Sequence, residues 1–196
     1  MITVVTRDYS NIEPNHREIL RYAGCREAED SIMTLMQDCL QEVSGILHGK
    51  TCYCVLSQQD IREISPLKQA IEGSEDLRHL LEGCSQIVVM AATIGVGIDR
   101  LMTKYGKIAP SKALMFHAIG VDGVENLCDQ VCQDVFKDMG KELTYRFSPG
   151  YGDLPLETQR VIFDLLDPAK NIGLTLQESL LMAPSKSVTA IVGVKN

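Results

Sequence analysis

The pattern of apolar and polar positions predicts a chain rich in amphipathic helices. Between Ala28 and Leu47, apolar residues recur every three or four positions, which is the spacing of one helix face. The segment from Pro110 to Lys141 is the clearest helix, because proline suits the first helical turn and Gly140 suits the end. Further helices are predicted at residues 15–22, 95–105 and 156–166, and after a Ser74 cap.

Other stretches have the composition of strands. Residues 86–92 are rich in Ile and Val and predict a buried strand, and residues 52–57 predict a shorter one. Residues 144–147 are expected to be extended and to lead into a Ser-Pro-Gly turn. In the tail from 174 to 194, two strand-like runs around Pro184-Ser185-Lys186 predict a hairpin. We therefore expect one α+β domain over residues 1–196, with helices flanking a mixed or antiparallel twisted sheet.

Length and charge exclude several classes of protein. A chain of 196 residues is long enough for one sizeable core and short for two. It has no apolar run of 18 residues, so no transmembrane helix or membrane partner is expected. The first residues lack the basic start and apolar core of a signal peptide, which predicts a cytoplasmic location. The net charge of −7 argues against a nucleic-acid partner, which needs a basic surface.

The seven cysteines do not form a regular framework. Cys52 and Cys54 are expected to point to opposite faces of a strand. Cys128 and Cys132 are four residues apart on a helix, a spacing that brings two metal ligands together, but no histidine or further cysteine nearby in sequence completes a tetrahedral site. Reduced structural thiols are therefore expected, and no metal site.

The strand-then-glycine sequence at Gly95 and Gly97 invites comparison with a dinucleotide-binding turn. Such a turn has glycine or alanine three positions after the second glycine, where this chain has Arg100. No regular βαβ series surrounds it either. We therefore expect a tight strand-to-helix turn in which the glycines serve backbone shape.

Glu125 lies on a largely apolar stripe of the long helix, four residues after Val121 and eight after His117. A carboxylate in such a position is costly unless it is paired or faces a cleft. Two interpretations stay open from spacing alone: Glu125 faces a cleft, or it lies at the edge of the stripe and reaches water. For His117 we expect a hydrogen-bonded core histidine rather than a catalytic base.

The segment from Tyr145 to Asp153 combines a guanidinium, aromatic rings and a Pro-Gly turn. An arginine grips a carboxylate through paired hydrogen bonds, and an aromatic face holds a cation or a flat ring. These are the needs of an amino acid that bears a sulfonium and an adenine. Composition alone favours an ordinary turn between a strand and a helix.

This turn carries Arg146, Gly150 and Tyr151 in the order Arg-x-x-x-Gly-Tyr. It resembles the signature with which the activation domain of cobalamin-dependent methionine synthase binds S-adenosylmethionine. The start of the long helix, Ala113 to Ala118, and Glu125 also resemble positions of that family. The order is kept farther on by Glu178, Ser179, Met182 and Pro184. The resemblance is strongest over residues 86–194.

The resemblance implies an accessory role in a methionine synthase system. When the cobalamin cofactor oxidises, a flavodoxin-like reductant supplies one electron, and S-adenosylmethionine supplies the methyl group that traps the reduced cobalt. Cobalamin would reach this chain only through a partner, a separate cobalamin-binding methionine synthase chain. The implied S-adenosylmethionine-binding residues are Glu125, Arg146, Phe147, Pro149, Gly150 and Tyr151.

The chain also departs from that family. It has no Asp-x-His-x-x-Gly motif for holding cobalamin and no cysteine ligands of a homocysteine-activating zinc site, so it is not expected to be a complete methionine synthase alone. Family domains are larger, have an acidic N-terminal ligand contact without a counterpart here, and carry a further strand that contacts the ligand. Two alternatives stay open: a non-catalytic module that binds a corrinoid protein, and a methyltransferase that uses S-adenosylmethionine with another acceptor.

Overall fold

The centre of the fold is an antiparallel sheet of four strands in the order β1-β2-β3-β6. The computed structural model describes residues 2–25 and 29–196. Strands β3 and β6 are runs of Val, Ile and Ala that are buried on both faces, as expected of residues that favour a covered sheet. The four strands are β1 (Val5–Tyr9), β2 (Gly49–Ser57), β3 (Cys84–Thr93) and β6 (Ser187–Lys195).

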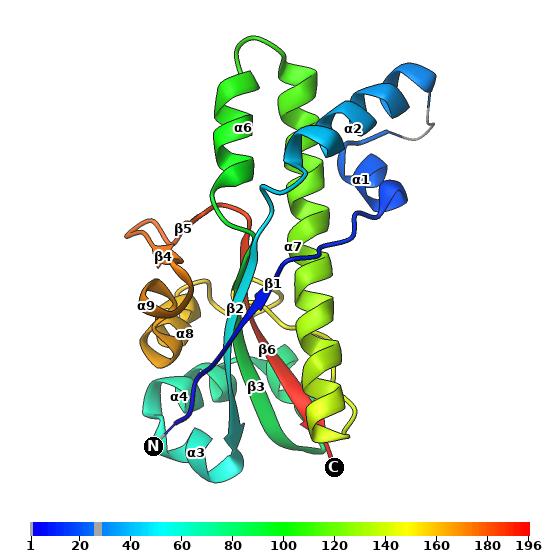
Figure 1. Cartoon of the computed structure of the whole chain (residues 1–196). Coiled ribbons are helices and arrows are strands. Elements are labelled where there is room, and N and C mark those ends of the chain that lie inside the picture. Colours follow the sequence, from blue (N-terminus) through cyan, green and yellow to red (C-terminus); the bar gives the residue numbers. More distant parts are fainter. Residues whose placement is uncertain (1, 26–28) are drawn as a thin grey trace.

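One face of this sheet is covered by the long helix α7 (Pro110–Met139), which lies along the strands (Figure 1). Its buried residues Val124, Leu127 and Val131 recur at helical spacing and pack in one apolar core with Val88, Met90 and Val192 of the sheet. Three further helices complete this layer: α1 (His16–Tyr22), α2 (Asp30–Val43) and α6 (Gly97–Tyr105).

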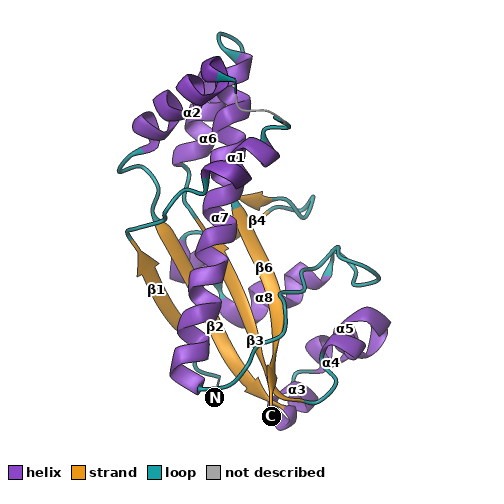
Figure 2. Ribbon diagram, turned by 90° about the vertical axis from the view of Figure 1, so that its right-hand side faces the viewer, coloured by secondary structure: helices purple, strands orange, loops and turns teal. Residues whose placement is uncertain are grey.

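The opposite face carries a second apolar core under shorter helices. Figure 2 shows α3, α4 and α5 grouped near one end of the sheet, with α8 on the side away from α7. Ile162 and Leu166 of α8 pack with Ile87, Val89 and Ile191 of the sheet. The helices here are α3 (Gln58–Glu63), α4 (Ser65–Gly73), α5 (Glu75–Leu80), α8 (Thr158–Leu166) and α9 (Pro168–Ile172). A two-stranded ribbon of β4 (Thr175–Leu176) and β5 (Met182–Ala183) lies beside them.

The expected α+β class and the main helices are confirmed. The long helix ends at Met139 because Gly140 adopts a left-handed conformation, with φ at 63°. The helix predicted from Ala28 to Leu47 extends from Asp30 to Val43, and its predicted start at Ala28 lies outside the described residues. Strand β1 and helices α3 and α4 were not predicted, because short elements carry little periodicity.

The predicted hairpin around Pro184-Ser185-Lys186 is wrong. Strand β5 pairs with β4, with Met182 opposite Leu176, whereas β6 pairs with β3 in the main sheet. The physical reason is burial. The β6 run is apolar on both faces and is covered from both sides only within the main sheet, whereas β5 has two residues.

The expectation for Cys52 and Cys54 is also wrong. Side chains two apart on a strand share a face, and both thiols pack in the core beneath α8 with Leu56. Thr51 and Tyr53 alternate with them and therefore face α7, where Tyr53 joins the other core.

The free edge of β6 is partly covered by the segment that follows α7. Phe147 and Ile191 exchange two backbone hydrogen bonds, of 2.9 and 2.8 Å, and the amide of Thr144 donates to the carbonyl of Gly193 at 2.9 Å. Leu143 forms a further bridge to Val194. This expected extended segment therefore lies antiparallel to β6 and leaves it at the Ser-Pro-Gly turn.

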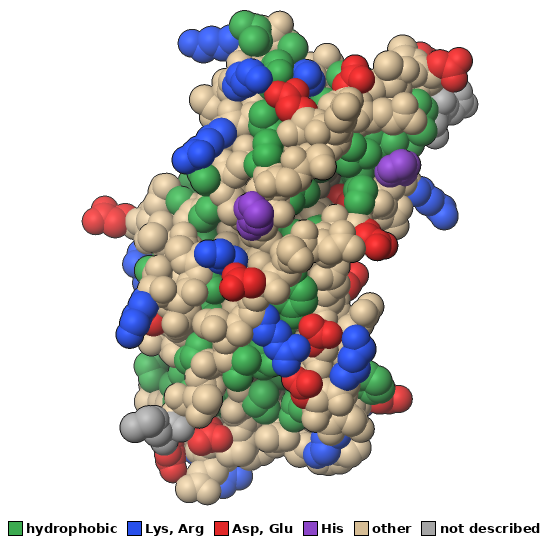
Figure 3. All heavy atoms as spheres, viewed as in Figure 1, with side chains coloured by type: hydrophobic (Ala, Val, Ile, Leu, Met, Phe, Trp, Pro, Cys, Tyr) green, Lys and Arg blue, Asp and Glu red, His purple; other side chains and the backbone are tan. Residues whose placement is uncertain are grey.

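The surface does not concentrate one sign of charge on the face drawn in Figure 3, where Lys and Arg are interspersed with Asp and Glu. Among residues 2–25 and 29–196, no helix combines the length and the apolar character needed to span a bilayer.

Thiol reactivity tests this arrangement. Five of the seven cysteines are buried, and only Cys25 and Cys132 are partly exposed. Burial raises the pKa of Cys39 to about 11 and the pKa of Cys52 to about 12, so these thiols stay protonated and unreactive at pH 8. We expect at most two thiols to react rapidly with Ellman's reagent in the native protein and all seven in guanidinium chloride. A third fast thiol in the native protein would contradict the buried positions.

Candidate functional site

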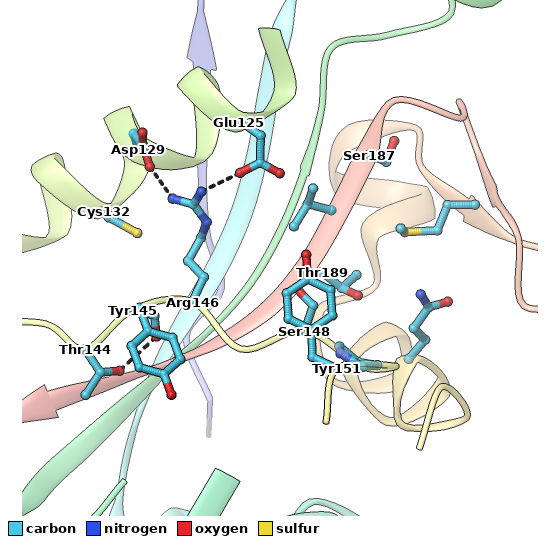
Figure 4. A pocket seen from close by; sticks show the side chains of 14 residues that line it. Glu125, Asp129, Cys132, Thr144, Tyr145, Arg146, Ser148, Tyr151, Ser187 and Thr189 are labelled. Carbon is cyan, nitrogen blue, oxygen red and sulfur yellow. Dashed lines mark hydrogen bonds and ion pairs between the residues drawn. The ribbon is translucent and has the colours of Figure 1, made fainter. Parts of the chain in front are cut away.

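A cleft of about 560 Å³ opens where the 144–151 segment leaves β6. Its walls come from α7, from this segment, from the first half of β6, and from α8 and β5, so it straddles the edge of the sheet between the two helical layers (Figure 4). The residues that line it are Glu125, Asp129, Cys132, Thr144, Tyr145, Arg146, Ser148, Pro149, Tyr151, Gln159, Met182, Ser187, Val188 and Thr189.

Arg146 crosses the cleft to α7 and meets two carboxylates one helical turn apart (Figure 4). Its Nη2 donates to Glu125 Oε2 at 2.6 Å, and its Nη1 donates to Asp129 Oδ1. The Arg146 side chain is 21 % exposed. Burial by itself lowers the pKa of Arg146, but the hydrogen bond to Asp129 and the nearby negative charges raise it overall, so the guanidinium is always charged.

This charged end has one cation and two anions, and so favours a ligand that carries both signs. A guanidinium has five N–H donors, and those not directed at Glu125 and Asp129 remain to meet a carboxylate. The two α7 carboxylates in turn attract a cationic group beside it. A zwitterionic amino acid fits this distribution of charge.

The turn from Ser148 to Tyr151 forms the wall of the cleft opposite α7. Gly150 has a φ of 91°, a left-handed conformation that strains any other residue. The amide of Tyr151 donates to the carbonyl of Ser148 at 3.0 Å, and the amide of Gly150 donates to Leu154 at 2.9 Å. Tyr151 is thereby left 58 % exposed at the cleft, where its ring is free to cover a flat or cationic group.

Phe147 does not line the cleft, contrary to its expected place among the binding residues. Its side chain is buried in the core beneath α8, and its ring packs edge-on against Tyr151 with the centroids 6.3 Å apart. The alternation along the extended segment explains the difference, because Arg146 points toward α7 and the next residue points away from it. The buried ring of Phe147 therefore packs against the ring of Tyr151 and helps to hold it in place.

Of the predicted binding residues, the structure brings together Glu125, Arg146, Pro149 and Tyr151 in one cleft, with Gly150 shaping the turn. Asp129, Gln159 and Thr189 were missed. Asp129 follows Glu125 by four residues, and this spacing on one helix could have identified it. Gln159 and Thr189 have no local signal, because they reach the same cleft only through packing of α8 on the sheet.

Two other candidates lie elsewhere. His117 faces Lys186, whose Nζ donates to His117 Nδ1 at 3.1 Å, and burial together with the charge of Lys186 lowers the pKa of the imidazole. The hydrogen bond agrees with the expectation from the sequence, but His117 is half-buried and does not lie in the core. Gly95, with a φ of 79°, and Gly97 form the expected tight turn into α6, and a Cβ at Gly97 would meet Ile46 Cγ2 at 2.1 Å.

Comparison with known proteins identifies a family and solved structures of similar fold. The family described as vitamin B12 dependent methionine synthase, activation domain, matches residues 23–196, and so extends well before the region of strongest resemblance in the sequence. A crystal structure of the MetH reactivation domain bound to AdoHcy has the same fold, with a TM-score of 0.65 at 15 % sequence identity. The match covers 98 % of this chain and 78 % of that one. No curated protein matches.

The family match spans most of the chain, and the fold of the solved reactivation domain extends over nearly all of it. The chain therefore belongs to the family of vitamin B12-dependent methionine synthase activation domains.

Proposed function

We propose that this chain binds S-adenosylmethionine in the cleft and presents its methyl group to cobalamin carried by a separate methionine synthase chain. The single observation that carries the proposal is the charged end of the cleft, where Arg146 lies between Glu125 and Asp129. The similar reactivation domain is bound to AdoHcy, the demethylated form of this donor. A cleft of about 560 Å³ lies within the range of small-molecule sites.

The charged groups of the donor have matching groups in the cleft. Arg146 takes the methionyl carboxylate through paired hydrogen bonds. Glu125 and Asp129 stabilise the positive charge of the ammonium and sulfonium groups by Coulombic attraction. Tyr151 and Pro149 cover the donor from the turn. These residues hold the donor in one orientation with its methyl group toward the open side of the cleft.

The contribution of this chain to the reaction is positioning. The partner's cobalamin supplies the reduced cobalt that accepts the methyl group, and the carbon–sulfur bond of the donor breaks to leave S-adenosylhomocysteine. No proton has to be removed, so Glu125 needs no role as a base. Holding the donor at a fixed distance and angle replaces a rare encounter with an oriented one. A flavodoxin-like protein is the proposed electron donor.

The first test is the affinity of Arg146→Ala for S-adenosylmethionine, measured by calorimetry. The loss of a charged hydrogen-bond donor should weaken binding by about 1.5–3 kcal/mol. Arg7→Ala is the matched control, because Arg7 likewise contacts two α7 carboxylates, Asp134 and Asp138, away from the cleft. Unchanged affinity in Arg146→Ala would remove this residue from the site, and an equal loss in both variants would indicate a general effect on the fold.

The second test concerns the charge of Glu125. Glu125→Gln should melt close to the parent, because Arg146 keeps Asp129 and a partly exposed ion pair contributes less than about 1 kcal/mol. Donor affinity, or the rate of reactivation with a cobalamin-loaded synthase, should fall. If reactivation and affinity match the parent, Glu125 serves neither donor nor partner. Donor binding without any reactivation of a synthase would favour another acceptor or a non-catalytic role.

A third expectation is that the purified chain carries neither cobalamin nor zinc. The Cys128 thiol is buried, which raises its pKa and opposes the ionisation that zinc binding requires. Visible absorption spectra should lack a corrinoid band, and elemental analysis should give far less than one zinc per chain. A stoichiometric amount of cobalamin would contradict the proposal that a separate chain carries it, and a stoichiometric amount of zinc would contradict the expected absence of a metal site.

A further inference from the structure

Two buried polar side chains line the uncharged end of the cleft without a hydrogen-bond partner. Gln159 is 6 % exposed and Thr189 is 2 % exposed. In the part of the chain that the structure describes, neither Gln159 Oε1 nor Thr189 Oγ1 has a partner. Such groups are rare in folded proteins, because burial removes the water to which they were bound. Both residues lie against the cleft, on elements that are distant in sequence.

The fold itself does not require either polar group. Thr189 shares its face of β6 with Ile191, and a valine has the same shape there. Gln159 shares the buried face of α8 with Ile162 and Leu166, where an apolar residue would be satisfied by packing alone. A polar group that weakens the core at two positions of one cleft is explained by a ligand that satisfies both when it binds.

The backbone beside Thr189 adds to this uncharged surface. The amide and carbonyl of Ile191 point to Phe147, at the open edge of β6. In an antiparallel strand these groups alternate between the two edges, so those of Thr189 point to the same edge. The 148–151 turn has left the strand at this level, and Figure 4 shows Thr189 beside Ser148 and Tyr151, away from the Arg146 ion pairs. The amide and carbonyl of Thr189 can therefore donate to and accept from a flat ligand at this edge.

We propose that Gln159 and Thr189 recognise the adenine ring of the donor, with its 6-amino group directed at their oxygens. A glutamine amide pairs well with adenine, because it accepts from the amino group and donates to the adjacent ring nitrogen. The two ends of the cleft then bind different parts of the ligand. The charged amino acid lies at Arg146, and the base lies at Gln159 and Thr189. This assignment rests on the proposed function and adds the residues that select the base.

The experiment measures S-adenosylhomocysteine affinity of the full chain by calorimetry in Gln159→Met and Thr189→Val, which keep shape and remove hydrogen bonding. Each should weaken binding by roughly tenfold, the scale of one net hydrogen bond. Thr51→Val is the matched control: its hydroxyl is equally buried and without a partner among the described residues, but Thr51 faces α7 outside the cleft. It should leave affinity unchanged.

Competition with nucleosides identifies the group that is recognised. Adenosine and purine riboside differ only in the 6-amino group, so the parent should prefer adenosine by several-fold, and Gln159→Met should lose that preference. The unliganded cleft variants should melt at or above the parent, because an unsatisfied polar group has been removed. Unchanged affinity in both variants, or an equal preference for the two nucleosides in the parent, would overturn the assignment.

The outcome is separable from that of the proposed function. If the parent binds the donor and Arg146→Ala does not, but Gln159→Met and Thr189→Val bind normally, only the adenine assignment fails. If the parent binds neither S-adenosylmethionine nor S-adenosylhomocysteine, both proposals fail.

Discussion

The pairing of β6 with β3 is the constraint on which the rest of the molecule depends. From Ser187 to Lys195 the strand is opposite β3 over its whole length, and its side chains enter the core beneath α7 and the core beneath α8 in turn. Its outer edge then captures the segment that follows α7 through Phe147 and Thr144. Without this register, the turn that carries Arg146 would have no fixed relation to the long helix.

The cleft owes its mixed chemistry to its position at this edge. A site on one face of a sheet is lined by one layer, whereas a site at the edge receives side chains from both layers. Here α7 contributes Glu125 and Asp129, and α8 contributes Gln159. The charged side chains of α7 and the uncharged side chain of Gln159 therefore line different parts of one cleft, an arrangement that suits a ligand with a zwitterionic end and a neutral aromatic end.

The arginine at the centre is held in place before any ligand binds. Its ion pairs with Glu125 and Asp129 fix a long side chain that would otherwise lose conformational entropy on binding. They also keep a net negative charge beside the guanidinium, so that a purely anionic ligand is disfavoured relative to a zwitterion. The buried ring of Phe147 fixes Tyr151 in a comparable way from the other wall. Much of the ordering needed for binding is thus already present in the fold.

The sequence by itself determined the local features of this protein. The long helix, its glycine end and the Arg146 to Tyr151 turn depend on residues close together in the chain, and the family resemblance followed from the turn and its flanking blocks. Helical spacing left open whether Glu125 faces a cleft or reaches water, and the family resemblance favoured the cleft. Only the tertiary structure decided that β6 joins the main sheet rather than forming a hairpin, and that Phe147 faces the core. The presence of Gln159 and Thr189 in one cleft is likewise a product of α8 packing on the sheet. The reason is physical: turns and caps are specified by contacts within a few residues, whereas strand partners and the orientation of a side chain at a sheet edge are set by burial between segments far apart in sequence.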